Sequence, residues 1–297
     1  MNYLDYLIPL LQLLCMNVIL AASLNVINGY CGLFSIGHAG FFAIGAYAAA
    51  AGSKLLMPEF AAAQPALALI ACVMIGAAAA GLAGLVVGIP CLRLTGDYLA
   101  IATVGFGEII RIVLLNTEAV GASRGFPGIV LLTGKWFPLW VLLFTVGSLY
   151  FIHRLMRSST GRAILSIRED EIAARSMGIN VRFYKTFAFV VGAFFAGLSG
   201  GFFAHHSQFI HPSNFNFMIS VMVLLMIVVG GMGSQMGAVL GAIIVTLLPE
   251  ALRFSETLSS IRMLIFGLIM ILVVLWQPQG LMGFYRKLFA TRKAEHA

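Results

Sequence analysis

Charged side chains are scarce in this chain. Lysine, arginine, aspartate and glutamate together make up 10% of its 297 residues, whereas a soluble domain carries about a quarter. Hydrophobic residues make up 61%, and the mean hydropathy is +0.99. A chain of this composition is suited to lipid rather than to water, so we expect a membrane protein.

Familiar signatures of catalysis are also missing. The sequence contains no glycine-rich phosphate loop of the GxxxxGK(S/T) type and no HExxH helix. We therefore expect the chain not to be an enzyme and not to hydrolyse ATP. If it transports a solute, the energy must come from a partner or from an ion gradient.

Cysteine and histidine give no metal site or disulfide framework. The four cysteines are scattered without paired spacing, which excludes a disulfide framework and an ordinary zinc site. His205, His206 and His211 lack a nearby fourth ligand, and a loop explains them. No cofactor and no metal are expected.

The basic residues are concentrated in two places. Seven of the eighteen lysines and arginines lie in residues 154–185, and four more lie in residues 286–293. Both clusters flank apolar segments, which is the pattern of cytoplasmic loops under the positive-inside rule. The net charge of +7 therefore indicates topology rather than nucleic-acid binding.

Long apolar segments occupy most of the chain. A helix needs about 20 mainly apolar residues to cross a bilayer. The candidates are residues 6–28, 33–53, 65–89, 98–116, 137–153, 186–206, 216–250 and 260–276.

The seventh segment is too long for one helix. Its glycine cluster at residues 230–237 predicts a break, giving a helical hairpin or two half-helices. The break makes the number of crossings between the two basic clusters even. Five spans precede the first cluster, which places the N-terminus outside, although the glycine-rich residues 28–45 leave the start of the chain open.

We therefore expect an all-α, polytopic membrane bundle of about 8–10 helices with a broken or re-entrant glycine-rich segment. Residues 1–297 form a single transmembrane domain. It includes a cytoplasmic loop at about 154–185 and a basic cytoplasmic tail at about 277–297.

Residues 161–185 form an unusually polar, amphipathic stretch. In helical register, four residues supply an apolar side: Ile164, Ile167, Ile172 and Met177. Five others stay in water: Arg168, Glu169, Asp170, Glu171 and Arg175. Ala173 and Ala174 leave a low patch, and Gly178 permits a sharp helix exit. Docking to a soluble partner and a plain solvated connector both fit this pattern.

A few polar residues lie within the apolar spans. Glu108 and Arg111 are three residues apart, so they share a helix face and can pair. A charge near the middle of a span faces protein or a wet cavity. The pair either lines a translocation path or locks two helices together. His38 either contacts substrate or is a satisfied packing histidine.

Glycines at helical spacing form two bare stripes. Gly233, Gly237 and Gly241 recur every fourth residue, and Gly197 and Gly201 repeat the pattern after the polar loop. Close approach of helices is the ordinary use of such stripes. We expect all five to pack helices together.

The polar loop resembles the cytoplasmic coupling loop of ABC importer permeases, whose pattern is Glu-Ala-Ala, three residues and Gly. The resemblance implies that Glu171, Ala173, Ala174 and Gly178 couple the chain to an ATPase. The match is incomplete, because Ile172 stands where the pattern has glutamate and Glu171 comes one residue early.

Three further stretches resemble branched-chain amino-acid importer permeases, most of all the M-type subunit of leucine/isoleucine/valine importers. They are Asn28–Tyr47, Arg93–Arg111 and Gly230–Gly241. The resemblance implies a multi-pass protein of a bacterial-type inner membrane. Its partners would be a second permease, two ATPase subunits, a periplasmic binding protein and the lipid bilayer.

Two alternatives stay open at this point. One is an ABC permease for a related solute, because similar proteins carry other amino acids, amides or urea. The other is a gradient-driven secondary transporter, which would work alone in liposomes. The sequence does not identify the amino acid carried.

Overall fold

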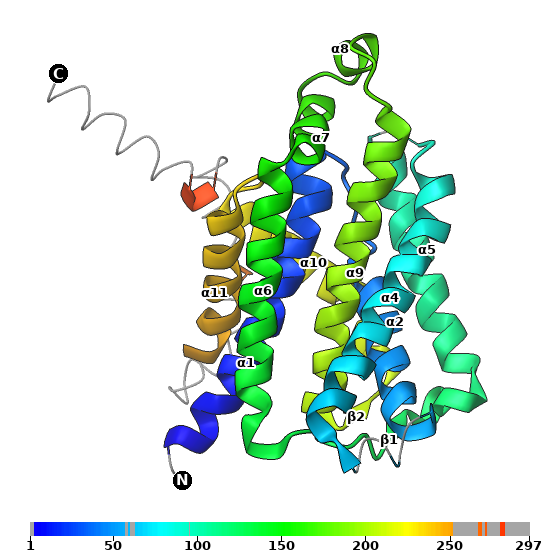
Figure 1. Cartoon of the computed structure of the whole chain (residues 1–297), viewed down its shortest axis with the longest axis vertical. Helices are drawn as coiled ribbons and strands as arrows, with labels where there is room; N and C mark the ends of the chain where they lie inside the picture. The colour runs from blue at the N-terminus through cyan, green and yellow to red at the C-terminus, as the bar shows by residue number, and fades with distance from the viewer. Residues whose placement is uncertain are drawn as a thin grey trace, which may run out of the picture.

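Helices make up almost all of the described chain (Figure 1). The structure is a computed structural model that describes residues 3–56, 59, 63–94, 96–251, 267, 268, 271 and 280–282. The expected all-α membrane bundle is confirmed. Apart from those isolated positions, the proposed span at 260–276 and the tail at 277–297 lie outside the described residues.

The helices follow one another with short connections. The α-helices are α1 (Tyr3–Leu24), α2 (His38–Ala51), α4 (Pro65–Cys91), α5 (Asp97–Asn116), α6 (Phe137–Arg157), α7 (Ser159–Glu169), α8 (Glu171–Ser176), α9 (Val181–Ser207), α10 (Phe217–Gly230) and α11 (Gln235–Ala251). The π-helices are η1 (Asn25–Tyr30) and η2 (Gly52–Leu56). The 3-10 turns are η3 (Glu118–Val120), η4 (Ala122–Arg124), η5 (Gly134–Trp136) and η6 (Pro212–Phe215). Strands β1 (Phe126–Pro127) and β2 (Phe209–Ile210) pair in antiparallel fashion.

Within the described residues, six helical stretches are long and apolar enough to cross a membrane. They are Tyr6–Tyr30, Pro65–Cys91, Asp97–Asn116, Gly134–Arg157, Val181–Ser207 and Pro212–Gly230. Helices α2 and α11 are shorter, with 14 and 17 residues. The start of α1 lies at the bottom of Figure 1, whereas α7 and α8 lie at the top. The N-terminal end thus lies at the opposite end of the bundle from the basic loop.

The second expected span is only partly helical. Residues 32–37 are not helical, and α2 begins at His38. The side chain of Asn28 replaces the missing helix bonds, because its Nδ2 donates to Ser35 O at 3.0 Å and its Oδ1 accepts from Ser35 N at 3.3 Å. Unpaired peptide groups are costly in hydrocarbon. This asparagine therefore allows non-helical backbone to lie inside the bundle.

The glycine-rich segment is a helical hairpin. Residues 231–234 separate α10 from α11, which confirms the predicted break. A Cβ added at Gly241 would lie 1.8 Å from the carbonyl oxygen of Met226, so the two arms touch backbone to backbone. Gly237 lies similarly close to Gly230.

Gly233 differs from the expectation of a packing stripe. It lies in the turn, with a φ of +80° that favours glycine. The helical period therefore does not extend back from α11 to this residue.

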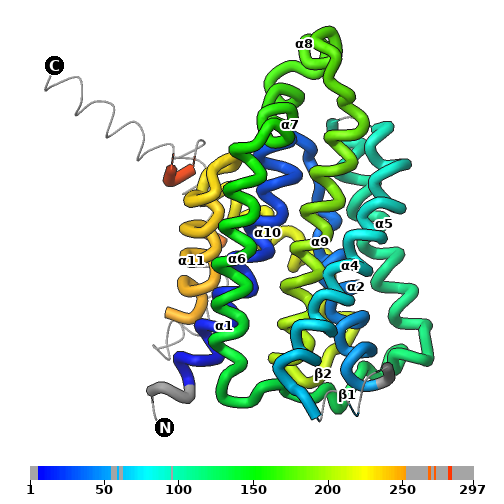
Figure 2. The backbone as a smooth tube through the Cα atoms, viewed as in Figure 1, coloured from blue at the N-terminus to red at the C-terminus, as the bar shows by residue number. Residues whose placement is uncertain are grey.

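Helix α9 occupies the centre of the bundle, against α1, α2 and α4 (Figure 2). A Cβ added at Gly197 would lie 2.3 Å from Ala80 Cβ and 2.8 Å from Gly76 O, both on α4. On the α2 side, a Cβ added at Gly45 would lie 2.2 Å from Gly197 Cα. The backbones of three helices therefore meet around Gly197.

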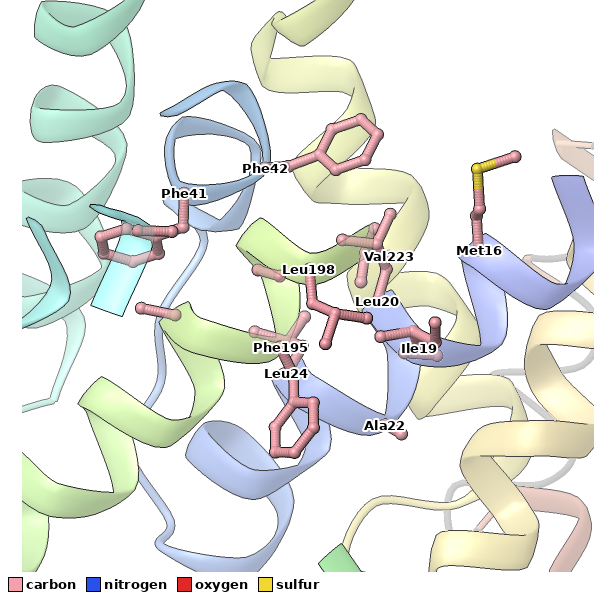
Figure 3. Packing of buried hydrophobic residues seen from close by; sticks show 14 of the residues in the cluster. Met16, Ile19, Leu20, Ala22, Leu24, Phe41, Phe42, Phe195, Leu198 and Val223 are labelled. Atoms are coloured by element: carbon pink, nitrogen blue, oxygen red, sulfur yellow. The ribbon is translucent and has the colours of Figure 1, made fainter. Parts of the chain in front are cut away.

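Larger side chains fill the space around this glycine contact. Figure 3 shows Phe195 and Leu198 of α9 close to Leu24 and Ile19 of α1. Phe189 of α9 also packs edge to face against Phe41 of α2, with ring centroids 5.5 Å apart. The core thus consists of a close backbone contact surrounded by aliphatic and aromatic packing.

We predict that Gly197→Ala lowers the melting temperature of the purified protein in detergent, whereas Gly147→Ala on α6 does not. Nothing in the described chain lies within 4 Å of a Cβ at Gly147. Both changes gain the roughly 1 kcal/mol by which alanine favours a helix over glycine. Only Gly197→Ala also suffers overpacking, which typically costs about 1–3 kcal/mol. Equal melting temperatures for the two variants would contradict the packing role.

Candidate functional site

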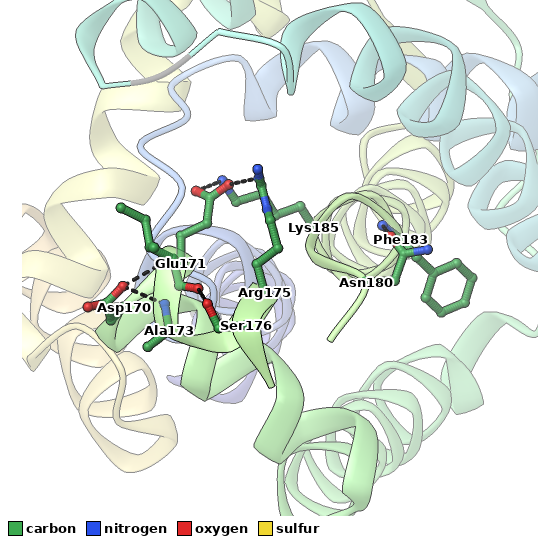
Figure 4. A network of polar contacts seen from close by, with 9 residues as sticks. Asp170, Glu171, Ala173, Arg175, Ser176, Asn180, Phe183 and Lys185 are labelled. Atoms are coloured by element: carbon green, nitrogen blue, oxygen red, sulfur yellow. Dashed lines mark hydrogen bonds and ion pairs between the residues drawn. The ribbon is translucent and has the colours of Figure 1, made fainter. Parts of the chain in front are cut away.

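The basic loop folds into two capped helices. The Ser158 hydroxyl accepts from Gly161 N at the start of α7. The Asp170 carboxylate accepts from Ile172 N at 2.8 Å and from Ala173 N at 3.0 Å at the start of α8 (Figure 4). Both are ordinary N-caps, which satisfy amide groups that lack a helical partner. The single residue Asp170 therefore ends one helix and starts the next.

A small apolar cluster holds α8 in place. Ile167 of α7, Ala174 of α8 and Val181 of α9 are buried together, with Ile179 and Tyr184 packed against them. Ala174 thus faces the protein, and only Ala173 of the expected low patch is exposed. The expected patch is corrected on this point, because α8 turns one face towards α9.

The tip of α8, by which we mean the exposed residues Ile172, Ala173 and Met177, is apolar. Ile172 and Met177 are 79% and 83% exposed. This corrects the expectation that they share an apolar side with Ile164 and Ile167, which are buried. The break at Asp170 rotates α8 relative to α7, so a single helical register does not extend through both.

Two ion pairs hold the first residue of α8, and a glycine follows its last turn. Glu171 accepts from Arg175 at 3.1 Å and from Lys185 of α9 at 2.5 Å (Figure 4). Gly178 has a φ of +82°, and its N–H donates to Arg175 O as the chain leaves the helix. No described atom lies within 4 Å of a Cβ at Gly178. The ion pair with Lys185 therefore holds α8 against α9, whereas no described atom covers α8 at Gly178.

A second polar region lies in the apolar part of the bundle, where residues 32–37 meet α2. The Ile36 N–H donates to Thr103 Oγ1 of α5 at 3.1 Å, and the Ala39 N–H donates to Ser220 Oγ of α10 at 2.9 Å. These hydroxyls replace helical partners of the backbone. A narrow crevice of about 10 Å³, roughly the room for one water molecule, lies here between the start of α2, α5, η6 and the start of α10.

Glu108 lines this crevice. Its Oε2 accepts from Arg111 Nε at 2.7 Å, and the two side chains are 34% and 27% exposed. The pair therefore forms within α5, on one face, as the spacing of three residues predicted. It does not join two helices within the described chain.

His38 is buried beside the crevice. Its Nε2 lies 2.7 Å from Ser23 Oγ of α1, and no described group bonds its Nδ1. The other histidines have separate partners: His205 bonds Val130 O, His206 bonds Gln12, and His211 bonds Ser123 O and Ser213. The structure therefore does not bring these histidines together.

Thr103, Ser220 and Arg168 were not singled out from the sequence. The two hydroxyl residues look like ordinary helix residues, because threonine and serine often bond their own helix. The signal that identifies them is their position opposite a glycine-rich, non-helical stretch. Arg168 was expected in water, but its guanidinium reaches Gly29 O at 2.7 Å.

Comparison with known proteins places this architecture. Residues 6–274 match the family model described as "Branched-chain amino acid transport system / permease component". The chain is 39% identical to the high-affinity branched-chain amino acid transport system permease protein LivM of Escherichia coli, over 91% of this chain and 68% of the relative. It is 38% identical to LivM of Salmonella typhimurium, with the same coverage.

A more distant relative is the probable branched-chain amino acid transport permease protein LivM of Methanocaldococcus jannaschii. It is 24% identical over 68% of this chain and 66% of the relative. No solved structure matches the chain. The apolar helical spans and the permease homology together make it a multi-pass membrane protein. The chain belongs to the family of branched-chain amino acid transport system permease components.

Proposed function

We propose that this chain is the membrane-spanning permease subunit of an ABC importer for branched-chain amino acids. The single observation that carries the proposal is the family match, which extends over residues 6–274. The relatives at 38–39% identity are named as permease proteins of high-affinity branched-chain amino acid transport systems. By this proposal, separate ATPase subunits supply the energy, and the complex lies in the inner membrane of a bacterium.

The tip of α8 is the proposed docking surface for an ATPase subunit. Ile172, Ala173 and Met177 are exposed there, next to the open Gly178. Exposed apolar side chains at the tip of a polar loop are suited to a partner's groove. The pair between Glu171 and Lys185 supports α8 from behind. Through this ion pair, a displacement of the tip by the ATPase subunit would be transmitted to α9.

We place this chain's half of the solute pathway on the exposed face of α5, and the other half on a second permease subunit. Only 17% of the apolar part of α5 is buried inside the chain, whereas 72% of the apolar part of α9 is buried. A charged pair on such a face would be unfavourable in lipid. A second permease subunit opposite Glu108 and Arg111 would enclose both side chains. A zwitterionic amino acid could then use the carboxylate of Glu108 and the hydroxyl of Ser220.

The first test is a pull-down of the tagged chain from native membranes in a mild detergent, with mass spectrometry of the bound proteins. We expect two ATPase subunits, a second hydrophobic permease and a periplasmic binding protein. We also expect uptake of leucine by the reconstituted complex to require ATP. Leucine uptake by this chain alone in liposomes would contradict the proposal and support a secondary transporter.

For the docking surface, we predict that the double variant Ile172→Asp with Met177→Asp loses co-purification with the ATPase subunits. Both side chains are exposed, so the fold should be unchanged. Burying a carboxylate in an apolar interface costs several kcal/mol, so binding should fall by more than about a hundredfold.

Ser159→Asp is the matched control. It adds a charge to an exposed position of the same loop, at the first turn of α7 where a negative charge is favourable. It should retain the ATPase subunits. Retention by the double variant as well would rule out the tip of α8 as the docking surface.

For the pathway, we predict that Glu108→Gln raises the concentration of leucine needed for half-maximal uptake by about tenfold or more, the effect of losing one charge-assisted hydrogen bond. Glu118→Gln, in the exposed turn η3, is the control and should leave this value unchanged. An unaltered value in Glu108→Gln would show that the carboxylate has no contact with the solute during uptake.

A further inference from the structure

The guanidinium of Arg168 connects the basic loop with the membrane helices. Arg168 lies in the last turn of α7, and its side chain is 38% exposed. Its Nη1 donates to Gly29 O of η1 at 2.7 Å, across 139 positions of sequence. The carbonyl groups in the last turn of a helix lack helical partners. Arg168 therefore satisfies a group that the end of η1 leaves free.

The same guanidinium also lies against the turn between α10 and α11. A Cβ added at Gly233 would lie 2.4 Å from Arg168 Nη1 and 3.1 Å from Gly29 O. The Asn25 side chain joins these two segments, because its Oδ1 accepts from Gly233 N at 2.8 Å and its Nδ2 donates to Ser234 O at 3.2 Å. Three segments distant in sequence thus meet at one arginine.

Glycine at two positions makes room for this arrangement. Gly233 lacks the side chain that would displace the guanidinium. Gly32 has a φ of +72°, and a Cβ there would lie 3.1 Å from Arg168 Cγ. The aliphatic stem of the arginine thus passes over Gly32, the first residue of the non-helical stretch.

The non-helical stretch 32–37 leads from this contact to the crevice. Residues 32–37 are not helical, and Ser35 in this stretch is bonded through its N–H and its carbonyl to the side chain of Asn28 in η1. Near their far end Ile36 donates to Thr103 of α5, and Ala39 in the first turn of α2 donates to Ser220 of α10. By these side-chain bonds, a shift of η1 at Gly29 is expected to reach the crevice that Glu108 lines.

We propose that Arg168 is a positioning residue for transport. Its contacts make η1 and the 231–234 turn move together with the basic loop. Through residues 32–37 it would transmit the movement of α7 and α8 to the crevice between α2, α5 and α10. This inference rests on the proposed function, because it supposes that ATPase subunits move the loop.

The test compares Arg168→Met with Arg162→Met in the reconstituted complex, with leucine uptake and ATP hydrolysis measured on the same vesicles. Methionine keeps an unbranched apolar stem and removes the donor. Arg162 is exposed on the same helix and bonds only Arg157 O at 3.2 Å within the described chain. We expect Arg168→Met to hydrolyse ATP but to lower uptake per ATP by about tenfold or more. Arg162→Met should match the unaltered complex.

A covalent replacement gives a second measurement on one protein. A Cβ at Gly32 would lie 3.5 Å from Arg168 Cβ, at the short end of the range of about 3.5–4.5 Å found in disulfides. A cysteine at residue 32 is strained by the φ of +72°, but equally in the oxidised and the reduced protein, so a comparison of the two cancels this effect. We expect Gly32→Cys with Arg168→Cys, in a Cys31→Ser background, to couple ATP to uptake better when oxidised. Reduction of the same vesicles should lower uptake per ATP.

Three outcomes would overturn the proposal. Arg168→Met could retain the normal ratio of uptake to hydrolysis. It could fail to co-purify with its partners, which would make Arg168 a folding residue. The double-cysteine protein could show the same ratio when oxidised and when reduced. If instead the unaltered complex shows no ATP-dependent uptake, the proposed function itself fails, so the two failures are distinguishable.

Discussion

The backbone contact of α9 with α2 and α4 is the constraint on which the rest of the structure depends. In hydrocarbon, apolar side chains gain little by exchanging lipid for protein, so helices associate through close van der Waals packing. Gly197 on α9, Gly45 on α2 and Gly76 on α4 bring three backbones together. This rigid centre carries the basic loop at the start of α9 and borders the stretch that contains the crevice.

The two polar regions of the chain depend on that centre in different ways. The loop is held at the start of α9 by Lys185 and by the apolar cluster around Ala174. The crevice lies at the start of α2, where side chains from α5 and α10 accept hydrogen bonds from the backbone N–H groups of Ile36 and Ala39. Both regions thus combine a fixed anchor with contacts that a small shift of a neighbouring helix would alter.

The sequence predicted the class of fold well, because membrane spans and basic loops follow from hydropathy and charge alone. It also located the break at residues 231–234 and the pairing of Glu108 with Arg111. It did not predict that Asp170 rotates α8 and exposes Ile172 and Met177, because helical period assumes an uninterrupted helix. The partners of Ile36 and Ala39 were missed since Thr103 and Ser220 are 67 and 181 positions away from the groups they bond.

Those long separations bear on the order in which the protein is made. Residues 28–39 enter the membrane early in synthesis, but Ser220 is translated about 180 residues later. Until α10 arrives, the first turn of α2 lacks one of its final hydrogen bonds, and hydrocarbon offers no substitute. The second crossing therefore reaches its final form only after most of the chain has been inserted, and an interruption of synthesis before α10 would leave it unfinished.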